Sequence, residues 1–132
     1  MKPLISIIIP TYNHADFLDR CFDSIIKQTY RNWEVIVIDN YSNDHTSTVV
    51  KKYSNYNITY LKFKNNGIIA SSRNYGISKS RGSLIAFLDS DDWWEDNYIS
   101  SRAKLFSDEN YHYYYCNTKI FYEKTKKNRT YK

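Results

Sequence analysis

Acidic residues follow directly on two hydrophobic runs in this chain. Asp39 follows the first run, and a cluster of Asp89, Asp91 and Asp92 follows the run at 83–88. Three carboxylates within four residues repel one another. A bound divalent cation is the simplest compensation, because it neutralises this charge and uses the oxygens as ligands. Such a cation most often serves a phosphate or diphosphate leaving group. The alternative is a polar turn with a helix cap.

The composition is that of a globular protein. At 132 residues and 42% hydrophobic, the chain is long enough for one domain with a core. No apolar run approaches the roughly 18–20 residues that span a bilayer. The opening apolar run is too short for a signal peptide and is interrupted by Pro10. We therefore expect Met1 to be the true start of a cytoplasmic protein.

The formal charge of +5 is concentrated near the end of the chain, in the segment 119–132. Such a basic tail could contact nucleic acid or anionic lipid. The alternative, which we favour, is a solvated end. The 14 tyrosines follow no regular spacing, so they predict no aromatic platform for nucleic acid. We expect no nucleic-acid partner.

Hydrophobic periodicity predicts strands that alternate with helices. We expect Asn13 to cap the first helix and Gly82 to follow the third. The expected strands are 4–9, 34–38, 58–63, 84–88 and 111–116, and the expected helices are 16–28, 46–53, 68–80 and 94–106. This alternation predicts one α/β domain over 1–132 with a doubly wound, mostly parallel sheet.

Right-handed crossovers place the carboxyl ends of parallel strands at one edge of the sheet, where ligands of such folds bind. Residues 10–13, 39–44 and 89–92 each follow a predicted strand. We therefore expect these three segments to meet, although they are far apart in the sequence. This convergence favours a ligand site over an isolated helix cap.

Five short motifs occur in a characteristic order. They are SIIIPTYN at 6–13, VIVID at 35–39, SND at 42–44, ASSRNYG at 70–76 and AFLDSDD at 86–92. Together they resemble the nucleotide-sugar half of a family 2 glycosyltransferase with the GT-A fold. The resemblance implies a Rossmann-like sheet that stops before the acceptor half. It also implies an inverting transfer of sugar from a nucleotide diphosphate sugar, with UDP as the expected nucleotide.

By this resemblance, Asp89, Ser90 and Asp91 are the family's Asp-x-Asp motif. Asp91 would bind Mn²⁺ or Mg²⁺, and Asp89 would contact the ribose or diphosphate, directly or through the metal. Hard cations of this kind often take only one or two carboxylates, with phosphates and water as the other ligands. We expect Asp92 to cap the following helix, with Trp93 and the next tryptophan packing behind it.

The resemblance assigns the nucleotide to two loops. Pro10, Thr11 and Tyr12 match the first loop and would flank the base, with packing within the loop as the alternative for Tyr12. Asp39 would accept a hydrogen bond from the uracil N–H, and its alternative role is a strand-end turn. Many relatives carry a second acid where this chain has Asn40, so the resemblance gives that residue no role.

Other residues of the motifs have supporting roles. Arg73 would aim its guanidinium at the nucleotide or diphosphate, and a solvated helix face is the alternative. We expect Asn74 and Gly76 to serve packing of the helix on the sheet. Ser42 and Asp44 would shape the second loop, and Asp44 could instead cap the next helix. The histidines have no shared spacing or evident partner, and we interpret them as non-catalytic: His14, His45 and His112.

No catalytic base can be assigned. Inversion needs a general base for the acceptor hydroxyl, but the remaining acids fall in no recognisable motif: Glu95, Asp96, Asp108, Glu109 and Glu123. Two interpretations stay open, a donor-binding half of a sugar transferase and a nucleotide-sugar-binding module without activity. A third, a basic nucleic-acid-binding domain, explains the charge but not the acidic edge, which repels phosphates.

The resemblance also implies partners and a location. The expected partners are a UDP-sugar donor and a saccharide or lipid-linked acceptor, at the cytoplasmic face of the cell membrane. A sheet edge left open would expose apolar surface and unpaired backbone groups, so we also expect self-association.

Overall fold

The computed structural model describes residues 2–103, 115–122 and 127–131. The chain divides into two compact units, 1–102 and 103–132, and each is described by itself. The single domain predicted over 1–132 stays a prediction. No helix in the described part of the chain is both long and apolar enough to cross a membrane.

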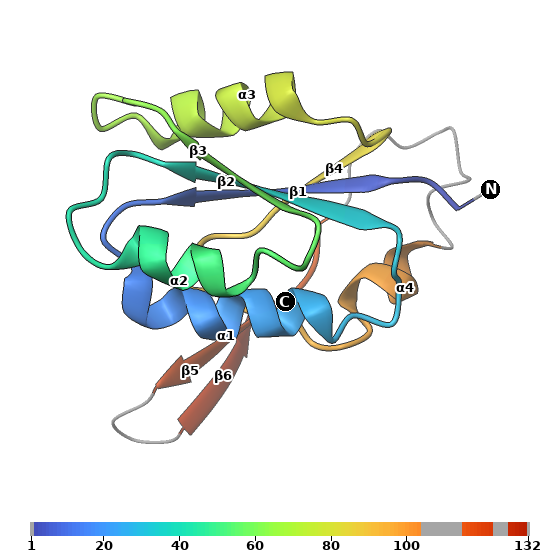
Figure 1. Ribbon diagram of the computed structural model, residues 1–132. Coiled ribbons are helices and arrows are strands. Elements are labelled where there is room, and N and C mark those ends of the chain that lie inside the picture. Colours follow the sequence, from blue (N-terminus) through green and yellow to red (C-terminus); the bar gives the residue numbers. More distant parts are fainter. Residues whose placement is uncertain (1, 104–114, 123–126, 132) are drawn as a thin grey trace. The chain divides into compact units, whose positions relative to one another are not determined.

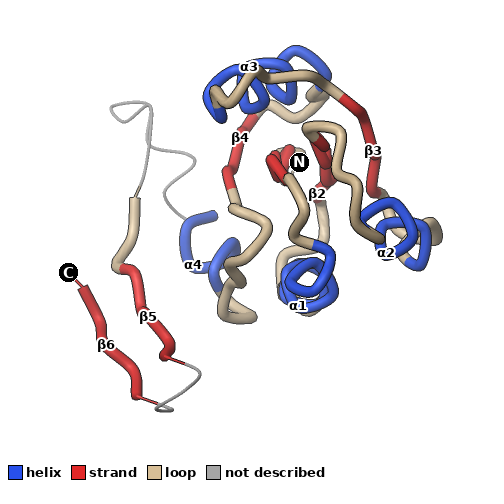
Figure 2. The backbone as a smooth tube through the Cα atoms, turned by 90° about the vertical axis from the view of Figure 1, so that its left-hand side faces the viewer, coloured by secondary structure: helices blue, strands red, loops and turns tan. Residues whose placement is uncertain are grey.

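The first unit is built on a parallel sheet with the strand order β3-β2-β1-β4. Its strands are β1 (Ile5–Thr11), β2 (Trp33–Asp39), β3 (Ile58–Lys62) and β4 (Leu84–Phe87). The helices are α1 (Ala15–Ile26), α2 (Thr46–Lys52), α3 (Ile69–Lys79) and α4 (Tyr98–Ala103). Helices α1 and α2 lie on one face of the sheet, and α3 lies on the other (Figures 1 and 2). The predicted doubly wound sheet is therefore confirmed.

The two central strands, β1 and β2, form the core. Every residue of both strands is buried, as expected for strands covered by helices on both faces. Helix α1 packs on one face through the apolar stripe that its three-and-four spacing predicts, which includes Leu18, Phe22 and Ile25. On the other face Ile8 and Ile38 form a cluster with residues that include Leu61, Phe63 and Tyr75.

Helix α3 approaches the sheet closely at a glycine. Only Ser72 and Gly76 of this helix are buried. A Cβ atom built on Gly76 would lie 2.5 Å from Ile8 Cγ2, well inside van der Waals contact. The packing role predicted for Gly76 is thus confirmed. The same expectation for Asn74 is wrong, because that residue is exposed and side chains two apart on a helix point in different directions.

A buried carboxylate ties the α3–β4 connection to the two central strands. Glu34 Oε1 accepts hydrogen bonds from Ser6 Oγ and from the Arg81 backbone N–H, both at 2.7 Å. Glu34 Oε2 accepts from Arg81 Nε at 2.8 Å and pairs with Arg81 Nη2 at 2.7 Å. Gly82 N donates to Ser6 Oγ at 2.8 Å. A Cβ on Gly82 would lie 2.7 Å from the Leu4 carbonyl oxygen, so only glycine fits where the segment before β4 passes the backbone at the start of β1.

Strand order explains where a ligand can bind. The chain moves outward from β1 to β2 and β3, and then crosses to the other side of β1 to form β4. Right-handed crossovers in opposite directions put their helices on opposite faces. The carboxyl ends of β1 and β4 therefore lie at the point where the winding reverses, which is the binding crevice of such sheets.

The edge strand β4 carries apolar side chains that are partly in solvent. Ile85 is 37% exposed and Phe87 is 46% exposed. These side chains are compatible with self-association, which stays a prediction.

The second unit holds a hairpin where the sequence predicts a solvated basic tail. Strands β5 (Thr118–Tyr122) and β6 (Lys127–Tyr131) pair antiparallel, with Thr118 opposite Tyr131 and Tyr122 opposite Lys127. Strand pairing uses backbone groups and leaves charged side chains free to be solvated, so the expected solvated end stays a prediction.

Two boundaries also differ from the predictions. The helix predicted at 94–106 begins only at Tyr98, and its residues 104–106 lie outside the described part. Of the strand predicted at 111–116, Tyr115 and Cys116 are not in a strand, and the rest lies outside the described part.

We predict that Glu34→Gln lowers the free energy of unfolding by about 1–3 kcal/mol near neutral pH, because it leaves buried donors without a charged acceptor. Burial alone raises the pKa of Glu34, but the hydrogen bonds from Ser6 and Arg81 and the Arg81 charge outweigh burial and hold the pKa below its usual 4.5. The stabilisation is therefore present above that value and is lost as the pH falls through the folded-state pKa.

Denaturant unfolding of wild type and variant at about pH 7 and about pH 3 tests this, since the difference should shrink at the acidic pH. The exposed Glu95→Gln is the control and should behave as wild type at both values. A deficit for Glu34→Gln that is the same at both pH values would contradict the prediction.

We predict that Gly76→Ala costs about 1–3 kcal/mol of stability, because the new methyl group must displace Ile8 in a packed core. Asn74→Ala, at an exposed position of the same helix, should change stability by about 0.5 kcal/mol or less. Thermal unfolding of both variants measures the difference. Equal melting temperatures for the two would show that α3 tolerates a wider spacing.

Candidate functional site

A pocket of about 430 Å³ lies at the carboxyl ends of β1 and β4. It is lined by the last residues of β1, by the loops that follow β1, β2, β3 and β4, and by the start of α3. The lining residues are Pro10, Thr11, Tyr12, His14, Asn40, Asn65, Gly67, Ile69, Asp89, Ser90 and Asp91. Segments distant in the sequence thus meet where the strand pattern predicts.

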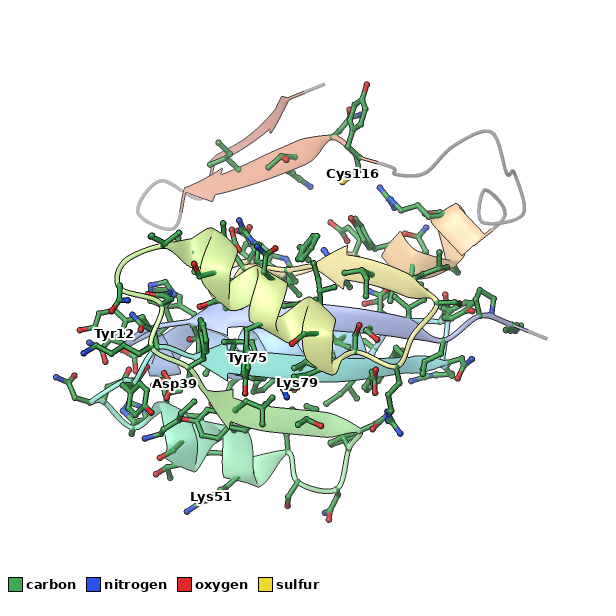
Figure 3. All side chains as sticks on the ribbon, turned by 90° about the horizontal axis from the view of Figure 1, so that it is seen from above. Tyr12, Asp39, Lys51, Tyr75, Lys79 and Cys116 are labelled. Carbon is green, nitrogen blue, oxygen red and sulfur yellow. The ribbon has the colours of Figure 1, made fainter. Side chains whose placement is uncertain are left out.

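Six of the predicted site residues line this pocket directly: Pro10, Thr11, Tyr12, Asp89, Ser90 and Asp91. The Tyr12 side chain is 53% exposed, so its ring is available to a ligand. The other two predicted residues, Asp39 and Arg73, lie behind the lining and contact the loops that form it. Figure 3 shows Tyr12 and Asp39 at the same end of the sheet.

The Arg73 side chain extends from α3 to the acidic loop, which is the segment Asp89–Asp92 that follows β4. Its Nη2 donates to Asp89 Oδ1 at 2.7 Å, and both side chains are part-exposed. Among the described residues, Arg73 Nε is buried and has no hydrogen-bond partner. Thr11 Oγ1, in the pocket wall, is in the same condition. Buried polar atoms are nearly always paired in folded proteins. Trp33 Nε1 and Thr46 Oγ1, away from the pocket, are also unpaired, so the two atoms near the pocket are compatible with a ligand but do not specify one.

The acidic loop carries more negative charge than its neighbours offset. Burial first, and then the charges of Asp91 and Asp89, raise the pKa of Asp92, while Arg20 lowers it. The loop turns tightly, with the Asp92 N–H donating to the Asp89 carbonyl at 3.0 Å. The predicted helix cap at Asp92 is wrong, because α4 begins only at Tyr98.

The donor set of this loop suits a hard divalent cation. Asp89 and Asp91 both line the pocket and supply only oxygen atoms. No group of three or more potential metal-binding side chains occurs in the described part of the chain. Two carboxylates would leave most of the coordination shell to phosphate oxygens and water, as Mg²⁺-type sites often do. The residues therefore fit a cation that arrives with a diphosphate.

Asp39 is fully buried, at 0% exposure. Its Oδ1 accepts hydrogen bonds from Ser42 N at 2.9 Å and from Ser42 Oγ at 2.5 Å. Its Oδ2 accepts from the Tyr60 hydroxyl. In this structure the Asp39 carboxylate holds the loop after β2, which is the alternative role of forming a turn at the strand end. Its contact with a uracil N–H stays a prediction.

The first two loops are joined by specific hydrogen bonds. Asn13 N donates to Ser42 Oγ at 2.8 Å. Asp44 accepts from Ala15 N and from Thr46 N, both at 3.0 Å, and so serves the first turns of α1 and α2 together. The predicted N-cap role of Asn13 is wrong, because α1 begins at Ala15 with His14 at the N-cap position. The loop-shaping role of Ser42 is confirmed by its bonds to Asp39 and Asn13, whereas the bonds of Asp44 match the helix-capping alternative.

Residues without a predicted role also line the pocket. His14 Nδ1 lies 2.8 Å from Ser90 Oγ, so this histidine has a partner that the sequence did not suggest. Asn40 Oδ1 accepts from Asn65 N at 3.0 Å, and Asn65 Oδ1 accepts from Gly67 N at 2.9 Å. Position in the sequence could have indicated Asn65 and Gly67, since the loop at 65–67 follows a strand of the same parallel sheet.

The structure adds no candidate for a catalytic base. Glu95 and Asp96 are exposed and do not line the pocket. Asp108, Glu109 and Glu123 lie outside the described residues, as does His112. Among the described residues of the pocket wall, the carboxylates are those of the acidic loop alone.

Comparisons with known proteins agree with this geometry. The family model described as Glycosyl transferase family 2 matches residues 6–132. The glycosyltransferase GlyA of Streptococcus pneumoniae serotype 4 is 38% identical over 102 residues, which are 76% of this chain and 14% of GlyA. The Escherichia coli protein WfgD, named a UDP-Glc:alpha-D-GlcNAc-diphosphoundecaprenol beta-1,3-glucosyltransferase, is 36% identical over 117 residues, 89% of this chain and 46% of WfgD.

Among solved structures, Staphylococcus aureus TarS 1-349 in complex with UDP is similar with a TM-score of 0.75 and 29% identity. The match covers 80% of this chain and 32% of that chain. This likeness confirms the fold that the motifs predict. The chain spans less than half the length of each of these three relatives.

Proposed function

Because the chain belongs to glycosyltransferase family 2, we propose that it binds the nucleotide diphosphate of a sugar donor, and specifically of a UDP-sugar. The observation that carries this proposal is the pocket that combines the loop of Thr11 and Tyr12 with Asp89–Asp91 of the acidic loop. The unpartnered Thr11 Oγ1 and Arg73 Nε are compatible with a ligand rich in acceptor oxygens. The TarS structure with UDP, similar in fold, supports uridine as the nucleoside.

In this proposal the two ends of the pocket have different tasks. Tyr12 and Thr11 flank the base, and the exposed Tyr12 ring offers a face for stacking. Arg73 turns from Asp89 toward the diphosphate, since a guanidinium forms two parallel hydrogen bonds with phosphate oxygens. Asp91 and Asp89 hold Mn²⁺ or Mg²⁺ through carboxylate oxygens. The cation, when bound, neutralises charge on the nucleoside diphosphate that leaves.

We further propose that the protein supplies the donor-binding part of an inverting sugar transfer to a saccharide or lipid-linked acceptor. The name of WfgD, which specifies a UDP-Glc donor and a diphosphoundecaprenol-linked acceptor, supports both substrate classes. A lipid-linked acceptor would place the reaction at the cytoplasmic face of the membrane.

A nucleotide-sugar-binding module without turnover is the second candidate. One observation favours it: the described pocket wall contains no acid other than the proposed metal ligands Asp89 and Asp91. Release of UDP from a UDP-sugar in the presence of a lipid-linked acceptor separates the two. Tight binding of UDP without release supports the module.

We predict that UDP binds the wild-type chain about tenfold more tightly with Mn²⁺ than without it, because the cation offsets repulsion between the acidic loop and the diphosphate. Asp91→Asn should abolish most of this difference. Asp96→Asn, which removes an exposed acid outside the pocket, is the control and should retain it. Titration calorimetry measures all six affinities. Equal affinities with and without Mn²⁺ in wild type would refute the metal assignment.

We predict that Arg73→Met weakens UDP binding by about tenfold but leaves uridine binding nearly unchanged, because the guanidinium serves the diphosphate and not the base. Lys79→Met removes the same charge from the same helix and should affect neither ligand. An equal loss for uridine and UDP would instead indicate that Arg73 supports the fold of the pocket.

A further inference from the structure

Tyr60, which no motif includes, donates its hydroxyl hydrogen to Asp39 Oδ2. It lies on β3, where its Cα is paired with that of Val37, two residues before Asp39. Its side chain is half-buried and does not line the pocket. Burial, and next the hydrogen bond to Asp39, raise the pKa of Tyr60, so the phenol stays protonated and remains a donor.

The hydrogen bonds continue from Asp39 to the wall of the pocket. Ser42 Oγ donates to Asp39 Oδ1 at 2.5 Å and accepts from Asn13 N at 2.8 Å. Asn13 adjoins Tyr12, and its own Oδ1 accepts from Asn43 N at 2.9 Å. One chain of contacts therefore runs from β3, through the end of β2, to the loop that follows β1.

The segments along this series of hydrogen bonds include two residues with sparsely populated backbone conformations. Asn13 has φ 52° and Tyr41 has φ 57°, both in the left-handed region. Asparagine enters this region more readily than most residues, whereas tyrosine seldom does. Such positions persist when surrounding contacts determine them. The contacts at Asn13 come from Ser42 and Asn43, and Ser42 is in turn held by Asp39.

We propose that Tyr60 is a positioning residue for nucleotide binding, acting through Asp39 and Ser42 on the loop that carries Tyr12. The inference rests on the proposed function, because it takes UDP as the ligand of the pocket. Asp39 is buried at 0% exposure, so loss of the Tyr60 hydroxyl leaves one oxygen of a buried carboxylate without its donor. A buried charge without its partners is costly. The carboxylate then moves toward other donors and takes Ser42 and the first loop with it.

Tyr53 provides a matched control. Its hydroxyl also donates to carboxylates, at 3.0 Å to Asp19 Oδ1 and 3.2 Å to Asp23 Oδ1. Like Tyr60, it is half-buried. Neither Tyr53 nor its partners line the pocket. A role confined to stability would make Tyr60→Phe and Tyr53→Phe equivalent, whereas a positioning role separates them.

The experiment measures UDP affinity of the full chain by calorimetry, at a temperature well below the melting temperature of every variant. Tyr60→Phe should weaken UDP binding by about tenfold, the size expected for a hydrogen bond to a charged group. Tyr53→Phe should leave the affinity unchanged even where it lowers the melting temperature. Equal affinities of wild type and Tyr60→Phe would overturn the inference.

A double-mutant cycle with Ser42→Ala tests the route. If Tyr60 acts through Asp39 and Ser42, the double variant should lose less affinity than the product of the two single losses. Independent, multiplicative losses would overturn the proposed route. Ser42→Ala also keeps the inference testable if Tyr60→Phe does not fold, since it should weaken UDP binding by itself, and an unchanged affinity would count against the inference. If the wild-type chain does not bind UDP, the proposed function fails first.

Discussion

The strand order around β1 is the constraint on which the rest of the structure depends. β1 pairs with β2 on one side and with β4 on the other, and all these pairs are parallel. Parallel strands with right-handed crossovers must present their carboxyl ends at the same edge. The reversal of winding at β1 leaves a crevice there that no crossover covers. The loop after β1 and the acidic loop after β4 meet in this crevice, and the proposed diphosphate site follows from that meeting.

The constraint has an electrostatic consequence. It brings a cluster of carboxylates to the pocket wall, and Arg73, which lies behind that wall, is paired with Asp89 at 2.7 Å. The arginine and the acids satisfy one another only in part, since Arg73 Nε lacks a partner among the described residues. A diphosphate with a cation would complement both, giving acceptor oxygens to the arginine and positive charge to the acids. The same groups would be a poor match for an uncharged ligand.

Much of the fold could be predicted because it depends on local pattern. Runs of β-branched residues predict β1 and β2, and an apolar stripe at helical spacing predicts α1. The errors fall where distant contacts override local preference. Asn13 looks like a helix cap, but the Ala15 N–H at the start of α1 donates to Asp44, which lies 29 residues beyond Ala15. Asp92 looks like a cap as well, yet the helix that it would serve begins at Tyr98.

The sequence by itself determined the family, the order of the elements from β1 to α4 and six of the residues that line the pocket. It could do so because motifs at strand ends inherit their position from the parallel sheet. Only the tertiary structure decided how the side chains divide the work. It placed Asp39 behind the wall with Ser42 and Tyr60 as donors, and it joined His14 to Ser90. These pairings depend on three-dimensional proximity between separate loops, and spacing along a single chain carries no record of it.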